Sequence, residues 1–152
     1  MAKFKYRMQS ILNLRCKLEE QQRATLASAR FKLNEEEGKL DELFRRKRDY
    51  EENIREAFKE KFNVHEVRMR GQAYASMDYF ITEQKTEVKK AEVTVEKEQD
   101  KMIEAMRRRK IQEKLREKFH ERFLKEENYK EALAVDELVS YKYGVKEKRG
   151  RI

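Results

Sequence analysis

The residues with the most evident capacity for chemistry are two histidines, one cysteine and two basic clusters. His65 and Glu66 begin like the zinc-binding pattern HExxH, but Met69 occupies the position of the second histidine. His120 is distant in the sequence, and Cys16 has no neighbouring histidine that could act as its base. The sequence therefore predicts no catalytic residue, no metal site and no cofactor, and it indicates a protein that is not an enzyme.

The basic clusters are RRKR at residues 45–48 and RRRK at residues 107–110. The chain has 38 Lys and Arg against 30 Asp and Glu, a net charge of +8, and basic surfaces of this kind can bind nucleic-acid phosphates. Acidic residues flank both clusters, however, and no aromatic residues alternate with them as in a single-strand-binding surface. We therefore expect an acidic protein surface as partner and no nucleic acid, with a nucleic-acid-binding coiled coil as the alternative.

The composition indicates how these residues are positioned. Charged residues make up 45% of the chain and hydrophobic residues 38%, with no proline, which is too polar for a compact globular core. Abundant Glu, Lys, Arg, Leu and Ala favour helices, and seven Tyr and eight Phe argue against disorder. A single cysteine, no signal peptide and no run of about 18 apolar residues predict a protein of the cytoplasm.

Apolar residues recur at heptad spacing in both halves of the chain. In the first half, one series is Met8, Arg15, Gln22, Ala29, Glu36, Leu43 and Tyr50. A companion series slips by one residue after its third member: Phe4, Ile11, Leu18, Leu26, Leu33, Leu40 and Ile54. The second half has Ile81, Val88, Val95 and Met102, followed by Ile111, Leu115, Phe119 and Phe123. Its companion positions are Met77, Gln84, Ala91, Glu98 and Ala105. Two such helices must bury their stripes against each other. The sequence thus predicts an all-α fold, a long antiparallel two-helix coiled-coil hairpin with the longer helix at the C-terminus.

Several seam positions of the two halves are polar. They are Arg15, Gln22, Glu36, Gln84, Glu98 and Arg109. One interpretation is that these long side chains extend out of a thin two-helix core into solvent. The other is that the seam is weak so that partners can complete it. In both cases we expect a marginally stable hairpin.

The turn is predicted within KFNVHEV, residues 61–67. Asn63 is a good N-cap, Glu66 completes a capping box, and Phe62 with Val67 forms a hydrophobic staple. Gly71 is the competing turn site. A turn at residues 62–63 gives helices at about 4–61 and 64–140 in a single hairpin domain, 1–144, followed by a disordered basic tail at 145–152.

This turn pairs residues whose numbers sum to about 125, so Phe4 is expected near Glu121 or Arg122, and Leu43 near Thr82. The helices would be about 87 and 115 Å long, so the second would extend roughly five turns beyond the first. The overhang would expose Phe123, Leu124, Tyr129, Leu133, Val135, Leu138, Val139, Tyr141 and Tyr143. Exposed apolar surface of this kind predicts a partner.

Three segments resemble a known family. FKYRMQSILNLR at residues 4–15 is similar to the start of the flagellar FliJ export proteins, and NVHEVRMRGQAYASMDYFITEQ at 63–84 resembles the start of their second helix. MRRRKIQEKLREKF at 106–119 and the late pair at 136–137 complete a resemblance that covers almost the whole chain.

The resemblance implies a non-enzymatic component of the flagellar type III export apparatus that looks like the central stalk of a rotary ATPase. It implies three partners: the hexameric export ATPase, whose assembly and activity it would promote, the cytoplasmic domain of the export gate, and the export chaperones of late substrates. The protein would be cytoplasmic and located at the cytoplasmic face of the membrane at the flagellar base, a peripheral association through the export apparatus only. The related stalk of a virulence secretion system is the alternative.

The resemblance also implies two binding surfaces. The end with both termini would enter the ATPase ring and carries Phe4, Tyr6, Arg7, Met8, Leu133, Leu138 and Tyr141. The gate-binding surface would correspond to Leu43, Tyr50, Met77, Phe80 and Gln84. Because Leu43, Tyr50 and Met77 are also seam positions, simple core packing is an equally open interpretation of these three residues.

Overall fold

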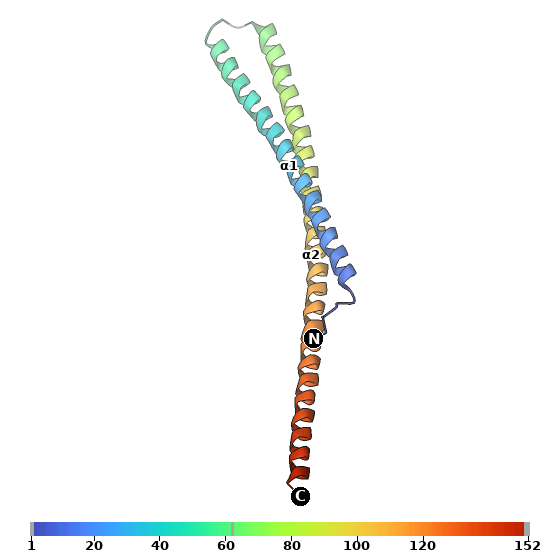
Figure 1. Cartoon of the computed structure of the whole chain (residues 1–152). Helices are drawn as coiled ribbons and strands as arrows, with labels where there is room; N and C mark the ends of the chain where they lie inside the picture. Colours follow the sequence, from blue (N-terminus) through green and yellow to red (C-terminus); the bar gives the residue numbers. More distant parts are fainter. Residues whose placement is uncertain (1, 62, 151–152) are drawn as a thin grey trace. The chain divides into compact units, whose positions relative to one another are not determined.

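The computed structural model describes residues 2–61 and 63–150, and within these ranges it contains two α-helices and no strand. Helix α1 spans Gln9–Phe58 and has 50 residues, and α2 spans Val64–Arg149 and has 86 residues (Figure 1). The predicted all-α hairpin, with the longer helix at the C-terminus, is confirmed.

The chain forms two compact units. In the unit Leu18–Ala105, α1 and α2 lie antiparallel and are joined by the short link that precedes α2 (Figure 1). The other unit combines the residues up to Lys17 with those from Met106 onward, so that the N-terminal residues and the first turns of α1 pack on α2.

The turn lies where the cap at Asn63 was predicted. Oδ1 of Asn63 accepts a hydrogen bond from the backbone N–H of His65 at 3.3 Å, and its carbonyl accepts one from Val67 at 3.1 Å. Gly71 is inside α2, so the competing turn site is wrong. Among the described residues, the capping-box bond from the Asn63 backbone N–H to Glu66 is not seen. The proposed staple involves Phe62, which lies outside the described residues.

These contacts predict opposite effects of two alanine substitutions near the turn. Asn63→Ala removes the cap and should lower the free energy of unfolding by about 1 kcal/mol. Gly71→Ala should raise it by up to about 1 kcal/mol, because alanine favours a helix and the added methyl group would meet no atom within 4 Å. Urea unfolding followed by circular dichroism measures both values; the reverse order would place the turn at Gly71.

Three helix ends differ from the prediction. Helix α1 begins at Gln9 and ends at Phe58, instead of spanning about 4–61. Helix α2 continues to Arg149 instead of ending near 140, so residues 145–149, expected to be disordered, are helical. No positive φ interrupts the helix at Gly144. Three basic residues in the last turn also interact favourably with the negative end of the helix dipole.

The core is a narrow stripe between the helices. Its buried apolar residues are Tyr6, Leu12, Leu26, Ile81, Val88, Ala91 and Met102. Among the described residues no large side chain is fully enclosed, as expected when only two helices cover each other. The four members from α2 are seam positions that the heptad pattern predicted. In the first turns of α1, the buried positions differ from the predicted ones.

The predicted slip between Leu18 and Leu26 is wrong. Ile11 and Leu18 are about 40% exposed, whereas Leu12, Glu19 and Leu26 are buried at an unbroken spacing of seven residues. The pattern was misread because a carboxylate occupies one seam position. Glu19 is only 4% exposed, and its Oε1 accepts a hydrogen bond from Arg23 at 3.0 Å.

The register is close to the predicted one. Cross-helix bonds join Gln22 to Glu98 and Gln84 to Glu36, so facing residue numbers in this part sum to 120 instead of about 125. The difference arises because α1 ends three residues earlier than predicted, which moves the centre of the turn toward the N-terminus. Contacts nearer the N-terminus agree more closely: the Phe4 ring lies against His120 and Phe123, on either side of the expected Glu121 and Arg122.

Candidate functional site

The N-terminal strap, residues 2–8, precedes α1 and packs on α2. The ring of Phe4 lies edge-on to His120, with 4.9 Å between centroids, and 5.6 Å from the ring of Phe123. Tyr6 is 8% exposed, and its hydroxyl donates a hydrogen bond to Oε1 of Gln112 at 3.1 Å. The strap therefore packs on the part of α2 between Gln112 and Phe123.

Residues 4–8 of the strap were predicted to be helical but precede α1 in the structure. Their sequence pattern explains the difference. Phe4, Tyr6 and Met8 alternate with basic residues, which is the period-two pattern of an extended segment and not a helical one. In an extended chain Phe4 and Tyr6 point to the same side, so that both rings reach α2. This alternation was the available sequence signal for the strap and for its contacts on α2.

Beyond Phe123, α2 continues as the C-terminal segment, residues 124–149. Its large apolar side chains are 44–73% exposed: Leu124, Tyr129, Leu133, Val135, Leu138, Val139, Tyr141 and Tyr143. Successive helical residues are turned by about 100°, and these positions are spread around the whole helix. Charged residues lie between them, so the segment presents apolar side chains on every side of a single exposed helix, and exposed apolar surface of this extent favours a partner.

The structure thus divides the predicted ring-end residues into two groups. Leu133, Leu138 and Tyr141 are 44, 63 and 73% exposed in the C-terminal segment. Arg7 is also exposed, and Met8 is 40% exposed at the end of the strap. Phe4 is half-buried and Tyr6 is buried, so these two rings hold the strap on α2 instead of facing solvent.

Three predicted gate residues come together in the other unit. Leu43 of α1 and Phe80 and Gln84 of α2 line one shallow trough of about 530 Å³. Glu83, Thr86, Glu87 and Lys90 complete its lining. Phe80 is 54% exposed and is the one gate candidate with a mainly exposed side chain. The trough is open and combines an aromatic ring with charged walls.

The remaining gate candidates do not line this trough. Tyr50 is half-buried, and its hydroxyl donates a hydrogen bond to the carbonyl of Arg70 at 3.3 Å. Met77 is half-buried in the seam. Core packing is therefore the better interpretation of Tyr50 and Met77, while Leu43 contributes both to the seam and to the trough.

Four of the polar seam residues bind one another across the hairpin. Nε2 of Gln22 donates hydrogen bonds to the Glu98 carbonyl at 3.0 Å and to its carboxylate at 2.6 Å. Nε2 of Gln84 does the same to Glu36, at 3.0 and 2.5 Å. These four side chains are hydrogen-bonded between the helices. For them, extension into solvent and a seam left weak for partners are therefore both wrong interpretations. Arg109 pairs instead with Glu113 on its own helix at 2.7 Å.

These bonds make the stability of the hairpin depend on pH. The amide of Gln84, aided by Lys39, lowers the pKa of Glu36 below its usual 4.5, and Gln22, aided by Lys101, lowers that of Glu98. Because the folded pKa values lie below the unfolded ones, this stabilisation is present above about pH 4.5 and is lost as the pH falls through the folded values. Urea unfolding between pH 7 and pH 3 should therefore show a declining midpoint below pH 4.5.

A matched pair of variants isolates the two carboxylates. Glu36→Gln/Glu98→Gln should flatten the acid decline relative to the wild type. Glu92→Gln/Glu96→Gln, which replaces two exposed carboxylates of α2 that make no recorded cross-helix bond, should leave it unchanged. Equal flattening in both variants would show that net charge, and not the two seam bonds, causes the decline.

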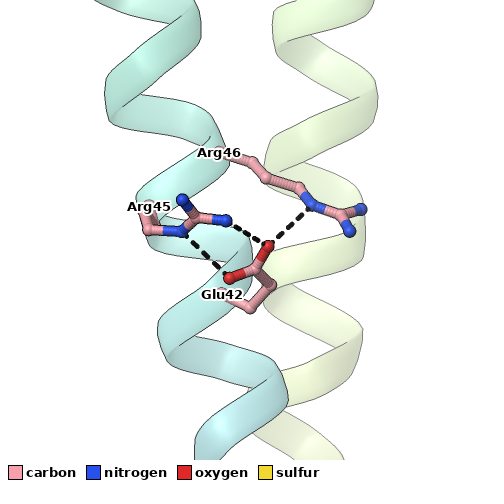
Figure 2. Close-up of polar contacts among 3 residues, drawn as sticks. All are labelled: Glu42, Arg45 and Arg46. Carbon is pink, nitrogen blue, oxygen red and sulfur yellow. Dashed lines mark hydrogen bonds and ion pairs between the residues drawn. The ribbon is translucent and has the colours of Figure 1, made fainter.

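Three residues of the basic cluster 45–48 make polar contacts within the hairpin. Glu42 accepts hydrogen bonds from Arg45 at 2.7 and 3.0 Å and from Arg46 at 3.3 Å (Figure 2). These arginines, Arg45 foremost, lower the pKa of Glu42. Lys47 reaches across to Asp78 at 2.7 Å. Its ammonium group therefore contributes to the pairing of the helices.

The Lys47 contact belongs to a small cross-helix cluster. Its Nζ lies 4.8 Å from the centre of the Tyr74 ring, and the Tyr74 hydroxyl donates a hydrogen bond to Glu51 at 2.7 Å. That bond raises the pKa of Tyr74, and the Asp78 carboxylate raises the pKa of Lys47. These polar contacts hold the half of the hairpin nearer the turn, where the apolar seam is thin.

Within the described parts of the chain, no three metal-ligating side chains gather into a possible ion site. Cys16 is a free, half-buried thiol in α1. Across residues 2–61 and 63–150, neither helix has an apolar stretch of the length that a bilayer crossing requires.

Comparison with known protein families gives one match. The model of the family described as "Flagellar FliJ protein" matches residues 4–148, which includes most of the strap, all of α1 and all of α2 except its last residue. No curated protein and no solved structure matches the chain.

Proposed function

Because the chain belongs to the flagellar FliJ family, whose members are structural components of the flagellar export apparatus, we propose that it is the stalk that binds the hexameric export ATPase. In this role it promotes assembly of the hexamer and ATP hydrolysis. The family membership favours the flagellar apparatus over a virulence secretion system. The protein acts in the cytoplasm, at the membrane face of the flagellar base, through its contacts with the apparatus.

The observation that carries this proposal is the C-terminal segment. Its apolar side chains are exposed on all sides of a single helix, with Leu138 and Tyr141 at 63 and 73%. A flat or grooved partner would cover one side of such a helix and leave the others in water, whereas the wall of a ring pore can surround it. Exposed Arg7 and Met8 at the end of the strap belong to the same unit and supply further contacts.

The second part of the proposal concerns the export gate. The trough formed by Leu43, Phe80 and Gln84 is the surface that binds the cytoplasmic domain of the gate, with the half-exposed ring of Phe80 as the main contact. Chaperones of late export substrates are the third class of partner. Aromatic side chains in shallow troughs contribute strongly to protein interfaces, which supports Phe80 in this role.

The proposal is tested by titrating the cognate export ATPase with the purified protein. Both the hexameric fraction, measured by light scattering after size exclusion, and the rate of ATP hydrolysis should rise until the binding sites are filled. A rate and an oligomeric state that stay unchanged over a wide concentration range would defeat the stalk function.

A further inference from the structure

The seam contains the same pattern twice. Residues 22–36 of α1 and residues 84–98 of α2 both read Q-x3-aliphatic-x2-A-x3-aliphatic-x2-E. Because the helices are antiparallel, the glutamine of each copy meets the glutamate of the other, as the bonds Gln22–Glu98 and Gln84–Glu36 show. The two copies are thus related by a local two-fold axis, and the register places Ala29 opposite Ala91 at its centre.

This arrangement satisfies the polar groups in one register only. A slip of one heptad would place all four of these residues opposite apolar residues in one direction, and three of the four in the other. In one direction the facing pairs become Gln22–Ala105, Glu36–Ala91, Gln84–Leu43 and Glu98–Ala29. In the other, the facing pairs become Gln22–Ala91, Glu36–Met77 and Gln84–Ala29, while Glu98 would face Arg15 and the other three residues would lose their hydrogen-bond partners. The apolar layers would still match after either slip, because they repeat every seven residues, so they do not select the register by themselves.

The same pairs also discriminate between orientations. In a parallel pairing of the two copies, glutamine would face glutamine, and Glu36 would face Glu98. Two carboxylates facing each other in a partly buried seam repel, and neither receives the amide bond that it has in the antiparallel hairpin. Opposite orientation is therefore favoured independently of the turn.

We propose that the pairs Gln22–Glu98 and Gln84–Glu36 form a register lock, which means that their hydrogen bonds fix which residues of α1 and α2 face each other. Gln84 serves the trough through this lock. The Gln84 amide nitrogen donates to both the carbonyl and the carboxylate of Glu36, so it is engaged within the hairpin. Gln84 is thus a positioning residue that keeps Leu43 beside Phe80. Its effect on gate binding rests on the function proposed above, whereas the lock itself does not.

The lock is tested with cysteines at the two-fold axis. The full chain carries Cys16→Ser, Ala29→Cys and Ala91→Cys, and the rate of intramolecular disulfide formation reports the fraction of hairpins in the observed register. In the lock-free variant, all four polar residues of the two pairs are replaced by leucine. We expect its melting temperature to be equal or higher but its disulfide to form several-fold more slowly, with some disulfide-linked dimers. A disulfide that forms as fast as with the native pairs would overturn the proposal.

A second set of variants keeps the composition almost native. Gln22→Glu places two carboxylates opposite each other and should slow disulfide formation, whereas Gln22→Glu/Glu98→Gln exchanges the members of the pair and should restore it. If the exchanged pair is as slow as the single variant, the residues do not act as a pair and the lock is refuted. Circular dichroism establishes that each variant is helical.

The link to the trough has a separate readout. The lock-free variant should bind the cytoplasmic domain of the export gate more weakly than the wild type, and closing the disulfide between its two introduced cysteines should restore binding. If restoring the register does not restore affinity, Gln84 acts by contact and not by position. If the wild type itself does not bind the gate domain, the gate function fails, while the disulfide rates still decide the lock.

Discussion

Leu133→Asp/Leu138→Asp should abolish the stimulation of the export ATPase without changing the stability of the hairpin. Both side chains are exposed in the free protein, at 44 and 63%, so the carboxylates are well hydrated there and cost little. Within a pore, the same carboxylates would have to be buried without partners, which is strongly unfavourable. The measurement is the rate of ATP hydrolysis against the concentration of each variant, together with its melting temperature.

The matched control uses the same helix. Val93 and Ile103 are 44 and 61% exposed, nearly the values of the two leucines, but they lie outside the C-terminal segment. Val93→Asp/Ile103→Asp therefore introduces the same charges on equally exposed positions. It should leave stimulation intact, and equal loss in both double variants would mean that charge alone weakens the interaction and that the C-terminal segment has no special role.

Ile81→Ala should have the largest effect on stability of any single truncation in the seam. Ile81 is 4% exposed, the lowest value among the buried apolar residues, and removing its buried methyl and methylene groups should lower the free energy of unfolding by about 3 kcal/mol. In a protein with so thin a core this is a large fraction of the total. Urea unfolding followed by helicity measures the loss.

Ile103 provides the comparison, since it is the same residue type in the same helix at 61% exposure. Ile103→Ala should change the free energy of unfolding by less than about 0.5 kcal/mol, because little buried area is lost and alanine favours the helix. Similar losses at both positions would contradict the seam described here and would require α2 to bury its opposite face.

The parts of the fold that could be predicted from the sequence are those set by local chemistry. The cap at Asn63 needs only its own side chain and two neighbouring N–H groups, and the heptad series Ile81, Val88 and Met102 needs only a regular helix with one covered face. The absence of proline allowed long helices, and the difference in length between the two helices followed from the position of the cap.

The parts that could not be predicted depend on side chains from distant parts of the chain. Glu19 lies in the seam beside Arg23, and a carboxylate at such a position reads as surface in the sequence. The bond between Gln84 and Glu36 joins side chains 48 residues apart, so it can be predicted only when the register is known. Similarly, the hydrogen bond from the Tyr6 hydroxyl to Gln112 depends on a residue 106 positions further along the chain.

Hydrogen–deuterium exchange of the full chain, with and without the export ATPase, tests the central claim most directly. In the free protein, amides near Leu26 and Ile81 should exchange slowly and those of residues 129–143 quickly, because only the former lie in the seam. Addition of the ATPase should slow exchange in residues 129–143 and leave the seam unchanged. An ATPase that is stimulated while residues 129–143 exchange as fast as before would show that binding occurs elsewhere, and the account of an enclosed C-terminal helix would be wrong.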